Sequence, residues 1–210
     1  MQRGLFIVLD GPDGCGKSTQ AGLLESHLRL HGVTPLHVRE PGGTALGEAV
    51  RKILLDAGHG TLTPQTELFL FSACRAQLVE RVLRPALAKG RVVLCDRWAS
   101  STYAYQGVAG GLGAAMVEAA TRLATGGLTP DLLLIFDVPP AIGIGRRGQR
   151  LTVFEKRGAR YLAAVRRGFL GFAKRCGRRA RVLDARRPVA EVHREVVRVV
   201  DALLRRRARA

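Results

Sequence analysis

Short β-rich runs alternate along the chain with longer stretches in which apolar residues recur at helical spacing. Most of these runs are continuously apolar, which is typical of strands that are buried on both faces. Because helical stretches separate successive runs, the pattern predicts a parallel sheet covered by helices on both sides. The predicted strands are LFIVLD (5–10), TPLHVRE (34–40), RVVLCDR (91–97), PDLLLIFDV (130–138) and ARVLDA (180–185).

The predicted helices fall between and after these strands. Pro85 predicts a kink or an end in the longest helix, and GVAGGLG (107–113) predicts a flexible loop. Without an internal repeat or a linker, the chain is expected to form one domain over residues 1–205, followed by a basic tail at 206–210. The first predicted helix follows the first strand and ends near residue 32. The other helices are predicted to span 45–57, 64–88, 112–124, 140–147, 157–175 and 189–205.

The stretch GPDGCGKST (11–19) follows the first predicted strand directly and fits the pattern G-x-x-x-x-G-K-[ST] of a phosphate-binding loop. Its glycines let backbone N–H groups turn toward one anion, and the following helix points its positive end at the same place. The lysine is expected to reach the β- and γ-phosphates of ATP. The predicted nucleotide-binding residues are Gly11, Asp13, Gly14, Cys15, Gly16, Lys17, Ser18 and Thr19.

Asp96 closes the third predicted strand, and Ser18 follows the lysine of the loop. An aspartate at the end of a buried strand, in a chain with a phosphate loop, is the usual second anchor for Mg²⁺. Ser18 and Asp96 are therefore the predicted Mg²⁺ ligands, with a capping or salt-bridging aspartate as the alternative. Together with the loop, the strand pattern predicts an α/β P-loop NTPase with a five-stranded parallel sheet.

Charge is distributed unevenly along the chain, whose formal net charge is +17. Residues 1–145 carry 13 basic and 12 acidic side chains, whereas residues 146–210 carry 21 and 5. Such a basic segment is either solvated helix surface or a surface that attracts nucleic acid. The four cysteines show no metal-binding spacing, which indicates reduced thiols and no zinc site. The scattered thiols therefore predict a cytoplasmic protein, and no apolar run approaches the length of a membrane span.

Four further motifs occur in a fixed order: REPGGT (39–44), FSACRAQLVE (71–80), DRWASSTYAYQG (96–107) and PDLLLIFDV (130–138). With the phosphate loop, they resemble the thymidylate kinase family over nearly the whole chain, from about Leu5 to Asp184. The resemblance implies phosphorylation of dTMP to dTDP with ATP and Mg²⁺, a step of dTTP synthesis. It also implies a possible homodimer, and it implies neither a membrane nor a nucleic-acid partner.

The resemblance assigns four residues to the phosphate and the sugar of dTMP. Arg39 and Arg97 match the arginines that hold the dTMP phosphate. Asp13 matches a carboxylate that accepts a hydrogen bond from the sugar 3′-hydroxyl. Tyr105 matches a tyrosine that crowds the 2′ position and disfavours ribose.

Four more residues are assigned to the base. Phe71 matches the aromatic side chain that stacks on thymine, and Arg75 matches the donor to thymine O4. Gln106 matches the amide near the N3 edge, and Ser101 lies near the base by analogy. Taken singly, Phe71 reads as a core residue and Arg75 as a salt-bridge partner; the ordered set of motifs favours the functional interpretation.

The lid departs from the family pattern. Many members carry an arginine in the phosphate loop where this chain has Gly14, so the cation must come from a lid at about 145–156. The sequence GRRGQRLTVFE (145–155) keeps Phe154 and Glu155 of the expected lid motif but not the preceding Asp-Arg pair. No general base is expected, because the attacking phosphate oxygen is already anionic. The predicted catalytic residues are Lys17, Arg97, Arg146 and Arg150, with Arg147 ranked lower.

Two alternative functions remain open at this stage. The first is a kinase of the same fold that acts on another pyrimidine nucleoside monophosphate, or on several. The second is an inactive P-loop protein that binds nucleic acid through its basic C-terminal third. The absence of RNP-like, zinc-finger and interleaved-aromatic patterns disfavours the second alternative.

Overall fold

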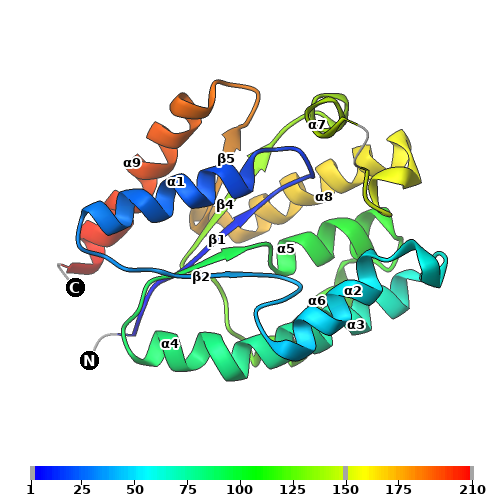
Figure 1. The fold of residues 1–210 in the computed structure, drawn as a ribbon, viewed down its shortest axis with the longest axis horizontal. Coiled ribbons are helices and arrows are strands. Elements are labelled where there is room, and N and C mark those ends of the chain that lie inside the picture. Colours follow the sequence, from blue (N-terminus) through cyan, green and yellow to red (C-terminus); the bar gives the residue numbers. More distant parts are fainter. Residues whose placement is uncertain (1–2, 149–150, 209–210) are drawn as a thin grey trace.

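The structure is a computed structural model that describes residues 3–148 and 151–208. Its centre is a parallel sheet of five strands in the order β2-β3-β1-β4-β5 (Figure 1). Each predicted run contains one strand, so the predicted sheet is confirmed. The strands are β1 (Phe6–Asp10), β2 (Leu36–Arg39), β3 (Val93–Asp96), β4 (Leu132–Asp137) and β5 (Ala180–Asp184).

Alternate residues of the strands point to two separate hydrophobic cores. On β1, Ile7 and Leu9 contact α1 (Lys17–Leu30) and α9 (Val189–Ala208) on one face of the sheet. Phe6 and Val8 lie in the core on the other face. That face is covered by α3 (Pro64–Leu78), α4 (Arg84–Ala88), α5 (Ala99–Thr102) and α8 (Ala159–Cys176) (Figure 1). All side chains of β1 are buried, which explains its continuous apolar sequence.

The remaining helices lie at the end of the sheet where the strands finish, or flank α3. They are α2 (Ala45–Leu55), α6 (Ala114–Thr125) and α7 (Pro140–Arg147). Short 3₁₀ turns span Ala57–His59, Glu155–Arg157 and Gly177–Arg179. The predicted helices are all present, and α9 continues to Ala208, into the segment predicted as a tail. No helix in the described ranges is long and apolar enough to cross a membrane.

The long helix predicted over residues 64–88 consists of α3, a π-helical turn at Val79–Leu83, and α4. Pro85 does not end it. Instead, the proline occupies the first turn of α4, directly after the widened turn, where its missing N–H is tolerated.

The flexible loop predicted at 107–113 is wrong for its first three residues. A π-helical segment, Tyr103–Ala109, follows α5 directly. Tight packing explains this conformation, since a Cβ on Gly168 of α8 would lie 2.7 Å from the Ala104 Cα. The close approach of α8 stabilises a helical backbone that a Gly-rich sequence would not favour on its own.

Candidate active site

The phosphate loop connects β1 to α1 and depends on glycines with positive φ angles. Gly14 has φ 73° and Gly16, the N-cap of α1, has φ 86°. No side chain caps the first turn of α1 and no acidic residue lies in it, which is the arrangement that favours an anion at a helix N-terminus. The buried Lys17 folds back over the loop, with its Nζ 3.5 Å from the Pro12 carbonyl and 3.8 Å from Asp13 Oδ1.

Helix α7 packs directly against the backbone of this loop. A Cβ built on Gly14 would lie 2.0 Å from the Gly143 carbonyl oxygen, and one built on Gly143 would lie 2.5 Å from the Asp13 carbonyl oxygen. Neither position can therefore hold a side chain without moving the helix. The contact explains why the loop carries no arginine at position 14.

The two predicted Mg²⁺ ligands are neighbours. Leu9 of β1 is paired in register with Asp96 of β3, which brings the end of β3 beside the phosphate loop. Ser18 Oγ donates a hydrogen bond to Asp96 Oδ2 at 2.8 Å. The other oxygen, Asp96 Oδ1, is buried and has no hydrogen-bond partner in the described part of the chain. A hydroxyl and a carboxylate with a spare oxygen are the hard ligands that Mg²⁺ prefers.

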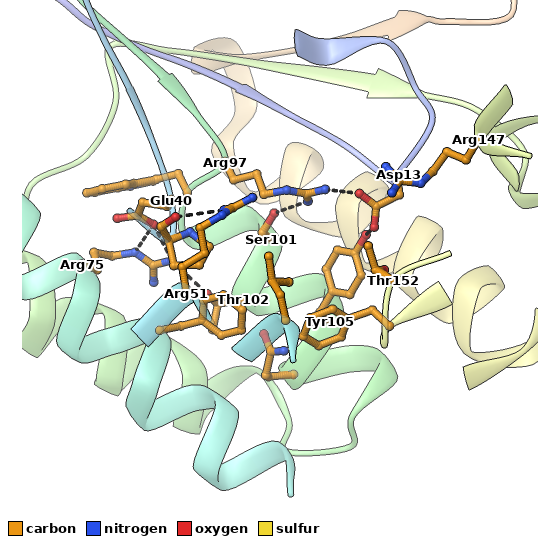
Figure 2. A pocket seen from close by; sticks show the side chains of 16 residues that line it. Asp13, Glu40, Arg51, Arg75, Arg97, Ser101, Thr102, Tyr105, Arg147 and Thr152 are labelled. Atoms are coloured by element: carbon orange, nitrogen blue, oxygen red, sulfur yellow. Dashed lines mark hydrogen bonds and ion pairs between the residues drawn. The ribbon is translucent and has the colours of Figure 1, made fainter. Parts of the chain in front are cut away.

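A cavity of about 310 Å³ lies beside the loop, at the carboxyl ends of the strands (Figure 2). We call it the acceptor cavity. Its position agrees with the rule that parallel α/β sheets bind ligands beyond the carboxyl ends of their strands. Seven of the eight predicted substrate-binding residues line it: Asp13, Phe71, Arg75, Arg97, Ser101, Tyr105 and Gln106.

The eighth, Arg39, does not line the acceptor cavity. Its side chain is 55% exposed and pairs with Glu48 at 2.9 Å. Arg51 of α2 lines the cavity instead, and its Nη1 donates to the Pro41 carbonyl at 2.9 Å. Sequence reasoning missed Arg51 because an arginine in an amphipathic helix reads as solvated surface. Only the packing of α2 against the residues after β2 turns it inward.

Asp13 is held between a cation and a phenol. Arg97 Nη2 pairs with Asp13 Oδ1, and the Tyr105 hydroxyl donates to Asp13 Oδ2 at 3.1 Å (Figure 2). Burial raises the pKa of Asp13, but the charges of Arg97 and Lys17 outweigh it and keep this pKa below its ordinary value. Asp13 is therefore an anion that accepts hydrogen bonds.

Arg97 itself is held in an unusual conformation. Its φ of 74° lies in the left-handed region, which a non-glycine residue occupies only at some cost. Its Nη1 donates to Ser101 Oγ at 3.1 Å. The buried Asp10, which sequence reasoning also missed, accepts hydrogen bonds from the Trp98 and Ser101 N–H groups and so fixes this turn. These contacts hold the Arg97 side chain in the lining of the acceptor cavity.

Arg75 is an almost completely buried arginine, with 1% of its surface exposed. Its Nε donates to Glu40 Oε2 at 2.8 Å and its Nη2 donates to Thr102 Oγ1 at 2.9 Å, whereas Nη1 is buried without a partner in the described residues. Burial raises the pKa of the Glu40 carboxyl to about 7, although Arg75 lowers it in part. One N–H edge of Arg75 is thus free to meet a ligand.

A second cavity, of about 570 Å³, lies on the other side of the phosphate loop. We call it the donor cavity. It is lined by the loop, the start of α1 and the turn after β5, including Gly14, Cys15, Gly16 and Thr19. The Cys15 thiol is buried, and this burial raises its pKa.

The lid arginines lie on different sides of the loop. Arg146 lines the donor cavity and donates to the Ala185 carbonyl at 2.9 Å. Arg147 lines the acceptor cavity, and its Nε is 2.9 Å from Glu155 Oε1. Arg150 lies outside the described residues.

A phosphate loop, a serine and an aspartate paired beside it, and two cavities that meet at the loop define the class of P-loop kinases. Within that class, a family model described as thymidylate kinase matches residues 9–196. The chain therefore belongs to the thymidylate kinase family.

Its curated relatives match over nearly their full length. The thymidylate kinase of Pseudomonas putida (strain GB-1) is 45% identical over 203 residues, which cover 96% of this chain and 95% of the relative. That of Desulfosudis oleivorans is 42% identical, with 94% and 96% covered. That of Pseudomonas fluorescens (strain SBW25) is 44% identical, with 97% and 98% covered.

Proposed function

We propose that this protein transfers the γ-phosphoryl group of ATP to dTMP, forming dTDP for dTTP synthesis. The observation that carries the proposal is that two cavities meet at one phosphate loop. Asp13 lines one of them, and Gly14 to Gly16 line the other. The names of the full-length relatives support the choice of dTMP. Incubation with ATP, Mg²⁺ and dTMP, followed by chromatography of the nucleotides, tests it; failure to form dTDP contradicts it.

The metal proposed for this reaction is Mg²⁺, held by Ser18 and Asp96. The buried, unpartnered Asp96 Oδ1 supports this assignment. When bound, Mg²⁺ neutralises charge on the phosphates of the donor. The chain contributes the rest: Lys17 lies over the loop, and the N–H groups of the first turn of α1 face the phosphates.

For dTMP, we propose that Arg97 and Arg51 hold the phosphate, because both line the acceptor cavity. Asp13 accepts from the sugar hydroxyl, and Tyr105, held against it, closes the site around the 2′ position. The unpartnered Nη1 of Arg75 donates to the base O4.

Catalysis then depends on positioning and charge. The nucleophile is a phosphate oxygen that is already anionic, so no residue has to remove a proton. The difficulty is to hold two polyanions in line, which several cations fixed around the loop achieve. Lys17 and Arg97 are two of these cations, and the lid supplies another.

Because Arg147 lines the acceptor cavity and Arg146 lines the donor cavity, we propose Arg147 as a catalytic lid arginine and Arg146 as a residue that binds the donor. Arg150 stays a candidate from the sequence alone. We expect Arg147→Ala to lower kcat by about 10² or more, with a modest change in KM, because an arginine on the transferring phosphoryl acts mainly in the transition state. Arg146→Ala should chiefly raise the KM for ATP, since that side chain lines the donor cavity. Steady-state assays with each substrate varied measure both effects.

The matched control is Arg160→Ala, an exposed arginine at the start of α8 that lines neither cavity. It should retain wild-type kinetics. If Arg147→Ala and Arg150→Ala both keep the wild-type kcat, the lid is a passive cover and the catalytic cation comes from another element.

We also propose a homodimer. Neighbouring helices α3 and α6 expose large apolar side chains, with Phe69 70% exposed, Met116 51% and Leu123 88%. A second copy of the chain would bury this face, as the family resemblance predicts. A monomeric mass in multi-angle light scattering at micromolar concentration would contradict it.

A further inference from the structure

A buried carboxylate, Glu67, binds the amide of Gln106 from behind the acceptor cavity. Both side chains are only 1% exposed. Gln106 lines the cavity, whereas Glu67, near the start of α3, does not. Gln106 Nε2 donates to Glu67 Oε2 at 2.8 Å. A carboxylate accepts hydrogen bonds and does not donate them, so the NH₂ group is the end of the amide that must face it.

This bond decides which atom of Gln106 is presented to a ligand. In the described residues, Gln106 Oε1 has no hydrogen-bond partner. An unrestrained amide offers either its oxygen or its nitrogen, because a rotation of 180° about χ3 exchanges them. With the nitrogen held at Glu67, the amide is fixed in the orientation that leaves its oxygen available to the cavity. Gln106 therefore acts there as an acceptor.

The carboxylate of Glu67 is itself fixed on its other side. Its Oε1 pairs with Nη2 of Arg157, and Nη1 of Arg157 donates to the Tyr161 hydroxyl at 3.2 Å. The Arg157 guanidinium also lies 4.9 Å from the centroid of the Phe154 ring. Arg157 and Gln106 thus both donate to Glu67, which accepts on both of its oxygens, one from each donor.

We propose that Glu67 is a positioning residue that determines base specificity, because it keeps Gln106 Oε1 directed at the substrate as a hydrogen-bond acceptor. An acceptor at this place selects a base with an N–H at ring position 3, which a 2,4-dioxopyrimidine has. A 4-aminopyrimidine presents an unprotonated ring nitrogen there and is rejected. The inference rests on the proposed function, and it adds to the donor that Arg75 presents to O4.

The direct test is Glu67→Gln. An amide at position 67 pairs with Gln106 in either orientation, so Gln106 is free to turn its NH₂ toward the base. The ratio of kcat/KM for dTMP to that for dCMP is then expected to fall by about tenfold or more, because a matched polar edge is the main source of discrimination. The change should appear chiefly in KM. Glu118→Gln, at an exposed ion pair with Arg175, is the matched control and should keep the wild-type ratio.

The exchange Glu67→Gln/Gln106→Glu is the decisive second variant. The new amide at 67 accepts from Arg157 and donates to the new carboxylate at 106, which again presents an oxygen to the base. Preference for dTMP should therefore return, at least in large part. A residue with only a structural role would not be rescued in this way.

Three results would overturn the inference. They are an unchanged dTMP/dCMP ratio in a folded Glu67→Gln variant, an equal loss for both nucleotides, and an exchange variant that stays unselective. If the wild-type protein forms no dTDP, the proposed function fails instead. Titration calorimetry with dTMP and dCMP, without ATP, then still measures whether Glu67 controls which base binds.

Discussion

Lys17→Ala is expected to abolish phosphoryl transfer while leaving the fold intact. The side chain is buried against the loop rather than in either hydrophobic core, and its Nζ lies 3.5 Å from the Pro12 carbonyl and 3.8 Å from Asp13 Oδ1. Removal of a charge that acts on the transferring phosphoryl group should lower kcat by about 10³ or more. Circular dichroism, thermal unfolding and activity should be measured on the same preparation.

Lys89→Ala provides the control, since Lys89 is exposed after α4, far along the chain from the loop. It should lose neither activity nor stability. Should Lys17→Ala retain even a tenth of the wild-type kcat, the assignment of residues 11–19 to the phosphates would be wrong.

The second large effect concerns the base. We expect dTMP and dUMP to be accepted and dCMP and dAMP to be rejected. A cytosine turns an amino group toward Arg75, so that two donors face each other in a pocket where the arginine is 1% exposed. Such mismatched polar edges lower kcat/KM by a factor of about 10⁴. Loss of the 5-methyl group should cost only about 1–3 kcal/mol, because it removes apolar contact alone.

The kcat/KM of each nucleotide, relative to that of dTMP, is measured at fixed ATP from the rate at which ADP is released. Turnover of dCMP within tenfold of dTMP would mean that Arg75 and Gln106 do not read the base. It would favour instead a kinase of broad pyrimidine specificity, the first alternative considered from the sequence. The second alternative, an inactive nucleic-acid-binding protein, is not favoured by the full-length thymidylate kinase relatives.

The sheet was predictable because most of its strands are short apolar runs and each is flanked by helical sequence. The phosphate loop was predictable because its function depends on backbone conformation, which fixes glycines at set spacings. The pairing of Ser18 with Asp96 followed from the same logic, since the ends of parallel strands converge. These features are local in sequence, or are imposed by sheet topology.

The residues that were missed depend on packing between distant elements. Arg51 enters the cavity only through the docking of α2, and Glu40 pairs with Arg75, which is 35 positions away. Glu67 is likewise fixed by Arg157 from beyond the lid. A charged residue in a helical pattern reads as solvent-facing, and no spacing rule reveals that an opposite charge meets it in the interior. The conformation of Tyr103–Ala109 escaped prediction for the same reason.

The contact between Gly14 and Gly143 constrains how this enzyme can diverge. An arginine grafted onto the loop at position 14 would need a Cβ 2.0 Å from a carbonyl oxygen of α7, in a backbone conformation that disfavours side chains. The loop and α7 are thus adapted to each other. An arginine at position 14 is incompatible with the observed packing of α7 against the loop. A protein with the arginine on the loop instead of the lid would need at least two coordinated changes, one at position 14 and one in the packing of α7. A variant with a side chain at position 14 alone would displace α7, the helix that carries Arg146 and Arg147.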